Sequence, residues 1–137
     1  MEPMLHEPLS QEAARLYSPL QLAYLGDAVW ELLVRSELAW QGLNVRHLHQ
    51  SSVARVNAAA QARALERMEG ALTEEEKQLV LRGRNAHPHH TVPKNQSPGD
   101  YAMATGLETL FGGLYITGQT ERLKELFRVS LEEEEHA

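Results

Sequence analysis

Two long stretches of this sequence carry almost no charge, and they constrain the fold more than any other feature. The first, residues 19–30, reads PLQLAYLGDAVW and is apolar or small apart from Gln21 and Asp27. The second, residues 101–117, reads YAMATGLETLFGGLYIT, and Glu108 is its only charged residue. A helix that is apolar on every side belongs in the interior of a domain. The sequence therefore predicts two buried helices that each contain one carboxylate.

Helical patterns also cover most of the remaining chain. Ser18 followed by Pro19 marks a helix start, because serine caps free N–H groups and proline at the first helical position sacrifices no hydrogen bond. Thr73 and Glu76 have the spacing of a capping box. No run alternates between apolar and polar residues as a strand does, so we predict an all-α fold. The expected helices are a short one after Ser10, then about 18–40, 45–68 (with any break near Ser51 and Ser52), 73–82, 101–117 and 120–131.

The composition fits one domain. The chain has 137 residues, of which 42% are hydrophobic, and this is enough for a single core. Cysteine is absent, which excludes disulfides and thiolate metal sites and fits a reducing compartment. The N-terminus lacks the basic start and apolar run of a signal peptide, so a cytoplasmic location is expected. The expected units are an N-terminal extension with a short helix (1–17), a main domain (18–131) and an acidic tail (132–137).

The net charge of −6 argues against a protein that simply coats nucleic acid. Its distribution is uneven, since residues 74–76 and 132–135 are all glutamate, whereas residues 35–67 hold five arginines against two glutamates. Residues 82–95 carry two arginines, one lysine and no acid. Short basic segments are often only solvated surface, so they identify no partner by themselves.

Asp27 and Glu108 stand out because burying an unpaired carboxylate is costly. Three interpretations are open for each of them. The carboxylate can form an ion pair in the core, for example with Arg35 or Arg84. It can reach the edge of its helix, or it can bind a metal ion.

A metal ion at such a site would be a hard cation. Mg²⁺ prefers oxygen ligands and is often held by one or two carboxylates together with a substrate phosphate, and Mn²⁺ is a natural substitute. Such an ion assists phosphodiester hydrolysis. Gly26 and Gly106 indicate that another backbone or a ligand approaches closely, and Gly112 and Gly113 indicate tight helix packing. Spacing alone does not bring the two carboxylates together.

The residues around both carboxylates resemble motifs of the ribonuclease III family. Residues 24–32 (YLGDAVWEL) resemble the run that carries a metal-binding Asp, and residues 107–116 (LETLFGGLYI) resemble the helix that carries a metal-binding Glu. The closer resemblance is to the short subfamily, Mini-ribonuclease III, which has a catalytic domain but no double-stranded-RNA-binding domain. It extends over about residues 18–127. The segments that carry it are 23–27, 82–86, 93–95 and 104–108.

The resemblance implies a homodimer of all-α catalytic domains, with residues 18–131 as that domain. Each subunit would supply one Asp27/Glu108 site, bind Mg²⁺ there and cut one strand of an RNA duplex, leaving 5′-phosphate and 3′-hydroxyl ends. The implied substrate is double-stranded precursor RNA, notably the stem of precursor large-subunit ribosomal RNA. A ribosomal protein that presents this RNA is a further candidate partner.

The resemblance also assigns supporting residues around the carboxylates. Longer members of the family carry further acids at the positions of Leu20, Ala23 and Thr105, so two carboxylates remain here and the number of metal ions stays open. Gly26 and Thr105 are expected to support the site. Glu31 lies one turn after Asp27 on the same face and is a candidate outer acid.

RNA contacts are expected from the proline-bearing loop of residues 84–99, because a long loop is often functional. Recognition of A-form RNA relies on shape, 2′-hydroxyls and phosphates. The segment His87-Pro88-His89-His90 has no local carboxylate, so RNA contact or exposure is favoured over a metal site. The RNA-binding residues expected in this loop are Arg84, Asn85, Lys94 and Asn95, and the helix region with Arg46, Arg55 and Arg63 is expected to add charge.

Two alternatives remain open at this point. The first is a non-catalytic ribonuclease III-like domain that only binds structured RNA or the ribosome, and the replacement of acids by Leu20 and Ala23 would suit it. The second is a helical protein-interaction module with two structural ion pairs. The retention of both Asp27 and Glu108 argues against the first alternative, and the match of both motifs argues against the second.

Overall fold

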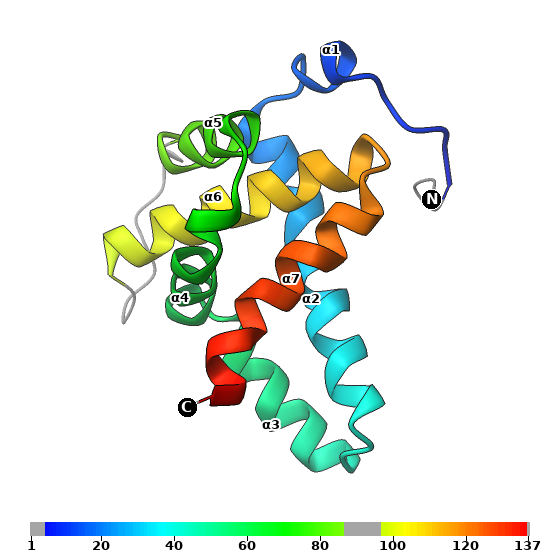
Figure 1. Cartoon of the computed structure of the whole chain (residues 1–137), viewed down its shortest axis with the longest axis vertical. Coiled ribbons are helices and arrows are strands. Elements are labelled where there is room, and N and C mark those ends of the chain that lie inside the picture. Colours follow the sequence, from blue (N-terminus) through cyan, green and yellow to red (C-terminus); the bar gives the residue numbers. More distant parts are fainter. Residues whose placement is uncertain (1–4, 87–96, 137) are drawn as a thin grey trace.

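The computed structural model describes residues 5–86 and 97–136, with side chains described as far as Leu131. All regular structure in these residues is helical, which confirms the predicted all-α fold. The elements, shown in Figure 1, are α1 (Gln11–Ala14), α2 (Pro19–Trp40), α3 (Val45–Val56), α4 (Ala58–Met68), a 3₁₀ turn η1 (Glu69–Ala71), α5 (Glu74–Arg84), α6 (Pro98–Ile116) and α7 (Thr120–His136).

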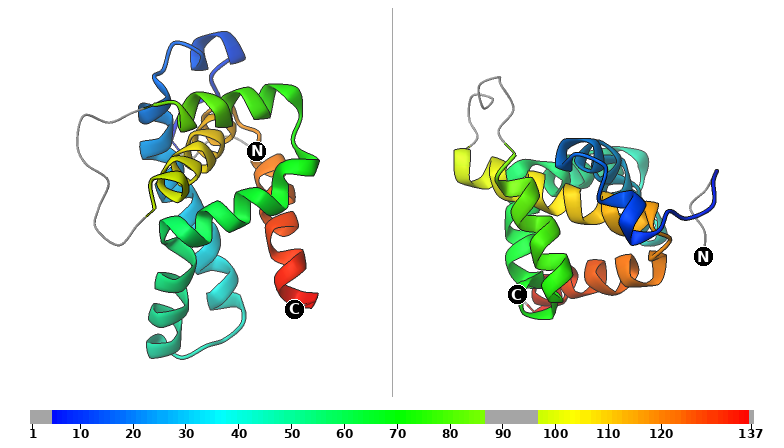
Figure 2. Two further views of the ribbon diagram at one scale, coloured as in Figure 1. Left: turned by 90° about the vertical axis from the view of Figure 1, so that its left-hand side faces the viewer. Right: turned by 90° about the horizontal axis from the view of Figure 1, so that it is seen from above.

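Helix α6 is the centre of the domain, and α2, α4, α5 and α7 all pack against it. Figure 1 shows α4 and α5 on either side of α6. Helices α2 and α3 form a hairpin whose tip points away from α6 (Figure 2). Across the described helices, none is long and apolar enough to cross a membrane. This arrangement places the two apolar stretches of the sequence, on α2 and α6, directly against each other.

Two glycines set how closely α2 and α6 cross. A Cβ atom added to Gly26 would lie 1.7 Å from the backbone oxygen of Glu108, and one added to Gly112 would lie 1.9 Å from the backbone oxygen of Leu22. Only a residue without a side chain allows this separation. The crossing therefore depends on one glycine from each helix, and it lies at the level of Asp27 and Glu108.

Aromatic side chains fill the core beside this crossing. The ring of Trp30 packs edge to face on Phe111 and on Phe127, with centroid distances of 5.3 and 5.2 Å. The indole N–H of Trp30 donates to the backbone oxygen of Arg55 at 3.3 Å, so its polar atom is satisfied. The Trp30 ring thus joins α2, α6, α7 and the end of α3 in one core.

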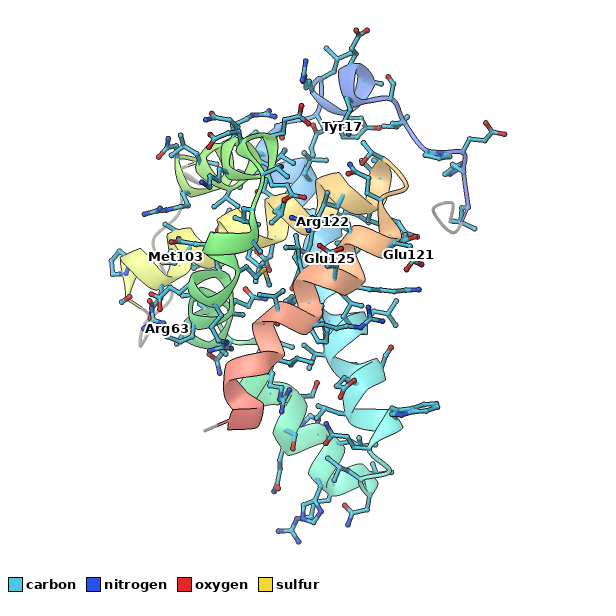
Figure 3. The ribbon with its side chains drawn as sticks, viewed as in Figure 1. Tyr17, Arg63, Met103, Glu121, Arg122 and Glu125 are labelled. Carbon is cyan, nitrogen blue, oxygen red and sulfur yellow. The ribbon has the colours of Figure 1, made fainter. Side chains whose placement is uncertain are left out.

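A polar cluster around Arg122 links α7 to the η1 turn and to the start of α5. The Arg122 guanidinium donates to both carboxylate oxygens of Glu76 at 2.8 Å and to the backbone oxygen of Ala71 at 2.6 Å. It also pairs with Glu125 on its own helix, as Figure 3 shows. Glu76 completes the predicted capping box with Thr73, so a local helix cap also serves a long-range contact.

Three predicted helix boundaries were wrong. The predicted helix over residues 45–68 breaks at Asn57, not near Ser51 and Ser52. Asn57 has an extended backbone, and its side-chain oxygen accepts from the N–H of Ala60 at 2.8 Å, which caps α4. Helix α6 starts at Pro98, capped by Ser97, rather than near Tyr101. The backbone of α7 continues past Leu131 to His136.

The prediction that α2 is buried on all sides was also wrong. Trp30 and Leu22 face the core, but the Tyr24 side chain is 86% exposed, and Leu20 and Leu32 are exposed as well. Asp27 is exposed on the same helix. Apolar composition indicates that a helix face favours burial. It does not show whether the face is buried within this chain or against another molecule.

Candidate active site

The crossing of α2 and α6 brings together two carboxylates that are far apart in the sequence. Asp27 projects from the exposed side of α2, and Glu108 is half-buried on α6. The two carboxyl groups lie close enough for Asp27 to raise the pKa of Glu108 through its charge and through hydrogen bonding. This adjacency was the step that residue spacing could not supply.

The electrostatics of the pair are unfavourable to two negative charges. Burial, then the charge of Asp27 and the hydrogen bond with Asp27, together raise the pKa of the Glu108 carboxyl from 4.5 to about 8. The neighbouring Gln61 side chain acts weakly in the opposite direction. Two carboxyl groups this close share a proton unless a cation neutralises them.

No base neutralises the pair in the described part of the chain. Arg35 instead pairs with Glu31, with 2.5 Å between Nη2 and Oε1. Among the described residues, neither Asp27 nor Glu108 forms an ion pair with Arg35 or Arg84, so the core ion-pair interpretation fails there. The helix-edge interpretation holds for the exposed Asp27 but not for Glu108.

The residues around the pair fit a hard divalent cation. Both groups offer carboxylate oxygens, which Mg²⁺ and Mn²⁺ prefer. The amide of Gln61 on α4 is buried and its Nε2 has no hydrogen-bond partner. In the described residues, no larger cluster of acids, histidines or cysteines forms. A cation held between Asp27 and Glu108 would therefore neutralise the repulsion between the two carboxylates.

The expected supporting residues occupy distinct positions. Gly26 is buried against α6 and sets the approach of the helices. Thr105 is buried one turn before Glu108, and its hydroxyl donates to the backbone oxygen of Tyr101 at 3.0 Å. Glu31 is engaged with Arg35. Their roles at the site stay predictions.

Two of the four expected RNA-binding residues lie in the described part of the structure. Arg84 ends α5 and Asn85 follows it as the C-cap, and both side chains are exposed. A Cβ added to Gly106 would lie 2.9 Å from Cγ of Arg84, so the arginine stem packs against α6 at Gly106. The expected residues Lys94 and Asn95, with the segment His87-Pro88-His89-His90, lie outside the described residues.

The arginines of the helix region are less available than the sequence indicates. Arg63, labelled in Figure 3, pairs with Asp100 of α6 at 2.7 Å and with Glu66 at 3.2 Å. Arg67 donates to the backbone oxygen of Ser130 at 2.6 Å. These contacts tie α4 to α6 and α7, so at least part of this positive charge serves the fold.

Sequence reasoning missed Gln61. Its neighbours on the buried face of α4 are Ala58, Ala62 and Leu65, all apolar. The sequence did contain a signal, because Gln61 is a polar residue within an apolar stripe of helical spacing. The many alanines around it make that stripe difficult to recognise.

The shifted pKa of Glu108 predicts an unusual pH dependence of stability. Between pH 4.5 and about 8 the folded protein holds a proton that the unfolded chain has released, so stability without metal falls as pH rises. At pH 8 Glu108→Gln is expected to be more stable than the wild type by roughly 2–4 kcal/mol, allowing for partial solvent screening. Thermal unfolding in EDTA at pH 5, 6.5 and 8 measures this.

The exposed Glu69→Gln variant is the control, and its unfolding should follow the wild type at every pH. Added Mg²⁺ should stabilise the wild type at pH 8 and leave Glu108→Gln unchanged. Parallel pH curves for the wild type and Glu108→Gln would show that Glu108 is ionised in the folded protein.

Comparison with known proteins identifies the family. The ribonuclease III domain family matches residues 20–119, which include both carboxylates and both motifs. The chain belongs to the ribonuclease III family. Mini-ribonuclease 3 of Symbiobacterium thermophilum is 47% identical over 113 residues, which cover 82% of this chain and 86% of that protein. Mini-ribonuclease 3 of Thermoanaerobacter sp. is 42% identical over 127 residues, which cover 92% and 89%.

A solved structure supports the same assignment. The crystal structure of a protein from Fusobacterium nucleatum superposes with a TM-score of 0.78 at 33% identity, over 88% of this chain and 96% of that one. The predicted resemblance to Mini-ribonuclease III is thus confirmed, and the chain is an endoribonuclease of the ribonuclease III type. This ribonuclease carries its family's two motifs on α2 and α6, where the helices cross.

Proposed function

We propose that this ribonuclease cuts double-stranded RNA with a divalent cation held by Asp27 and Glu108. The observation that carries the proposal is the contact between these two carboxyl groups, which raises the pKa of Glu108 and has no neutralising base among the described residues. A fold gains nothing from such a contact, whereas a cation site requires it.

Asp27 and Glu108 have different proposed roles. When bound, Mg²⁺ or Mn²⁺ would supply an activated water and stabilise the leaving oxygen, which gives 5′-phosphate and 3′-hydroxyl ends. Asp27 is exposed and so can face the substrate phosphate. Glu108 is half-buried, with its backbone held against Gly26, which keeps its carboxylate in a restricted position. Substrate phosphate and water would complete the coordination that two carboxylates leave unfilled.

We further propose that the active form is a homodimer. Leu20, Tyr24 and Leu32 follow each other at intervals of four or eight residues on α2, so they line one exposed face of that helix. Asp27 lies on the same helix beside this face. A second copy packed there would cover the apolar side chains and set two active sites near one another, as cutting both strands requires.

The proposed substrate is a paired precursor RNA in the cytoplasm, with the stem of precursor large-subunit ribosomal RNA as the leading candidate and a ribosomal protein as a candidate presenter. The resemblance to Mini-ribonuclease III implies this substrate, and the relatives named Mini-ribonuclease 3 support the resemblance. The competing proposal is a domain that binds structured RNA without cutting it. The cleavage experiment separates the two.

The first experiment uses a labelled, fully paired RNA and the same RNA as a single strand. We expect cleavage of the duplex with Mg²⁺ or Mn²⁺, no cleavage in EDTA, and little cleavage of the single strand. Sedimentation velocity on the same samples should show a dimer. Binding of the duplex without cleavage in any divalent metal would favour the binding domain, and equal cleavage of both RNAs would contradict duplex specificity.

Arg84 is expected to contribute to duplex affinity through phosphate contact. Arg84→Ala should weaken binding several-fold at moderate salt and reduce the slope of log K against log salt by about 1, with the helical fold retained. The same change at Lys77, which is exposed on α5 and pairs with Glu74, is the control and should have less effect. Binding is measured in an Asp27→Asn background to prevent cleavage. An unchanged salt slope would show that Arg84 does not contact the RNA.

A further inference from the structure

The side chain of Gln61 is the polar group in this domain that the fold explains least. It is only 2% exposed and lies on α4, among apolar residues of the face that packs on α6. Its Nε2 atom has no hydrogen-bond partner. An unpartnered buried amide destabilises a fold, and leucine or methionine would fill the same space at lower cost.

Glu108 is the neighbour that explains the position of Gln61. The Gln61 side chain lies close enough to the Glu108 carboxyl to lower the pKa of that group by hydrogen bonding. The Nε2 atom of Gln61 nevertheless has no well-aligned hydrogen bond, because Glu108 is turned toward Asp27. The amide and the carboxyl group are therefore adjacent but not aligned.

The chemistry of an amide suits the neighbourhood of a cation. A metal-binding carboxylate uses one oxygen lone pair for the ion and keeps others that need donors. A lysine or arginine in the place of Gln61 would supply a donor but would repel the cation, whereas an amide supplies N–H groups without net charge. A neutral donor beside Glu108 therefore orients the carboxylate without opposing a bound cation.

We propose that Gln61 is a positioning residue of the active site, whose amide N–H holds the Glu108 carboxylate in the orientation that binds a divalent cation. This inference rests on the proposed function, in which Asp27 and Glu108 are the metal ligands. Gln61 acts through Glu108, so its loss should weaken metal binding even when no RNA is present.

The test compares Gln61→Met and Gln61→Leu with the wild type, using the full chain stripped of metal. Binding of Mn²⁺ alone is followed by electron paramagnetic resonance of the free ion, and thermal stability is measured in EDTA. Both variants should bind Mn²⁺ roughly 10- to 100-fold more weakly. Their stability in EDTA should equal or exceed that of the wild type, because the unpartnered amide is gone. The concentration of Mg²⁺ that gives half-maximal cleavage should rise in proportion.

Thr120→Val provides a matched control. The Thr120 hydroxyl is also buried without a partner, at the start of α7, and its removal should leave Mn²⁺ affinity unchanged. Folded Gln61 variants with wild-type Mn²⁺ affinity would overturn the inference while leaving the proposed function intact. A loss of stability in EDTA in both variants would also overturn it, because the amide would then serve the fold. A wild type that binds no Mn²⁺ would overturn the metal site itself and the inference with it.

Discussion

Asp27→Asn is expected to reduce duplex cleavage by about 10³-fold or more while the protein stays folded. The amide keeps the shape of the side chain but removes its negative charge, and the cation then has only Glu108 as an ionic ligand. A loss of several kcal/mol in transition-state stabilisation corresponds to this factor. Because Asp27 is exposed, the substitution removes no core contact, and it also relieves the like-charge contact with Glu108.

The measurement is single-turnover cleavage of the labelled duplex at saturating Mg²⁺, with circular dichroism to confirm the helical fold. Glu37→Gln is the matched control, since Glu37 lies on the same helix and, within the described part of the chain, its carboxylate accepts a hydrogen bond only from Nε2 of Gln41, at 3.4 Å. That variant should cleave at the wild-type rate. If Asp27→Asn retained activity within tenfold of the wild type, Asp27 would not be a metal ligand.

Gly26→Ala and Gly112→Ala are expected to destabilise the protein by about 3 kcal/mol or more each. The added Cβ atoms would lie 1.7 and 1.9 Å from backbone oxygens of the facing helix, at distances that no side-chain rotation relieves. Helices α2 and α6 must therefore separate, which disturbs the core around Phe111. Separation also moves Asp27 away from Glu108, so any folded fraction should cleave poorly.

Gly113→Ala is an informative control because it lies next to Gly112 on the same helix. Its added Cβ would meet Cδ1 of Leu79 at 3.1 Å, and a flexible leucine side chain can move by a few tenths of an ångström. Alanine is also favoured over glycine in helices by roughly 0.5–1 kcal/mol, so a small change of either sign is expected. Urea denaturation measures all three variants. Wild-type stability of Gly26→Ala would refute the close helix crossing.

Local rules explain which parts of the fold could be predicted. Ser18 and Thr73 cap the helices that follow them through contacts within a single turn, so the residues that decide the structure are neighbours in the sequence. The break at Asn57 follows the same chemistry, but the alanine-rich sequence around it favours a continuous helix and concealed the cap. The apolar stretch with Tyr24 had the composition of a core helix, and composition does not distinguish a core from a surface that awaits a partner.

The sequence by itself determined the all-α class, most of the helix boundaries, and the two carboxylates that stand alone in apolar helices. The tertiary structure alone decided that Asp27 meets Glu108, that Arg35 is engaged elsewhere, and that Gln61 joins them from a third helix. The physical reason is the separation in sequence of the residues that interact. A helix cap depends on residues within about four positions of one another. The contact between α2 and α6 depends on Gly26 and Gly112, which allow the two backbones to approach closely but are far apart in the sequence.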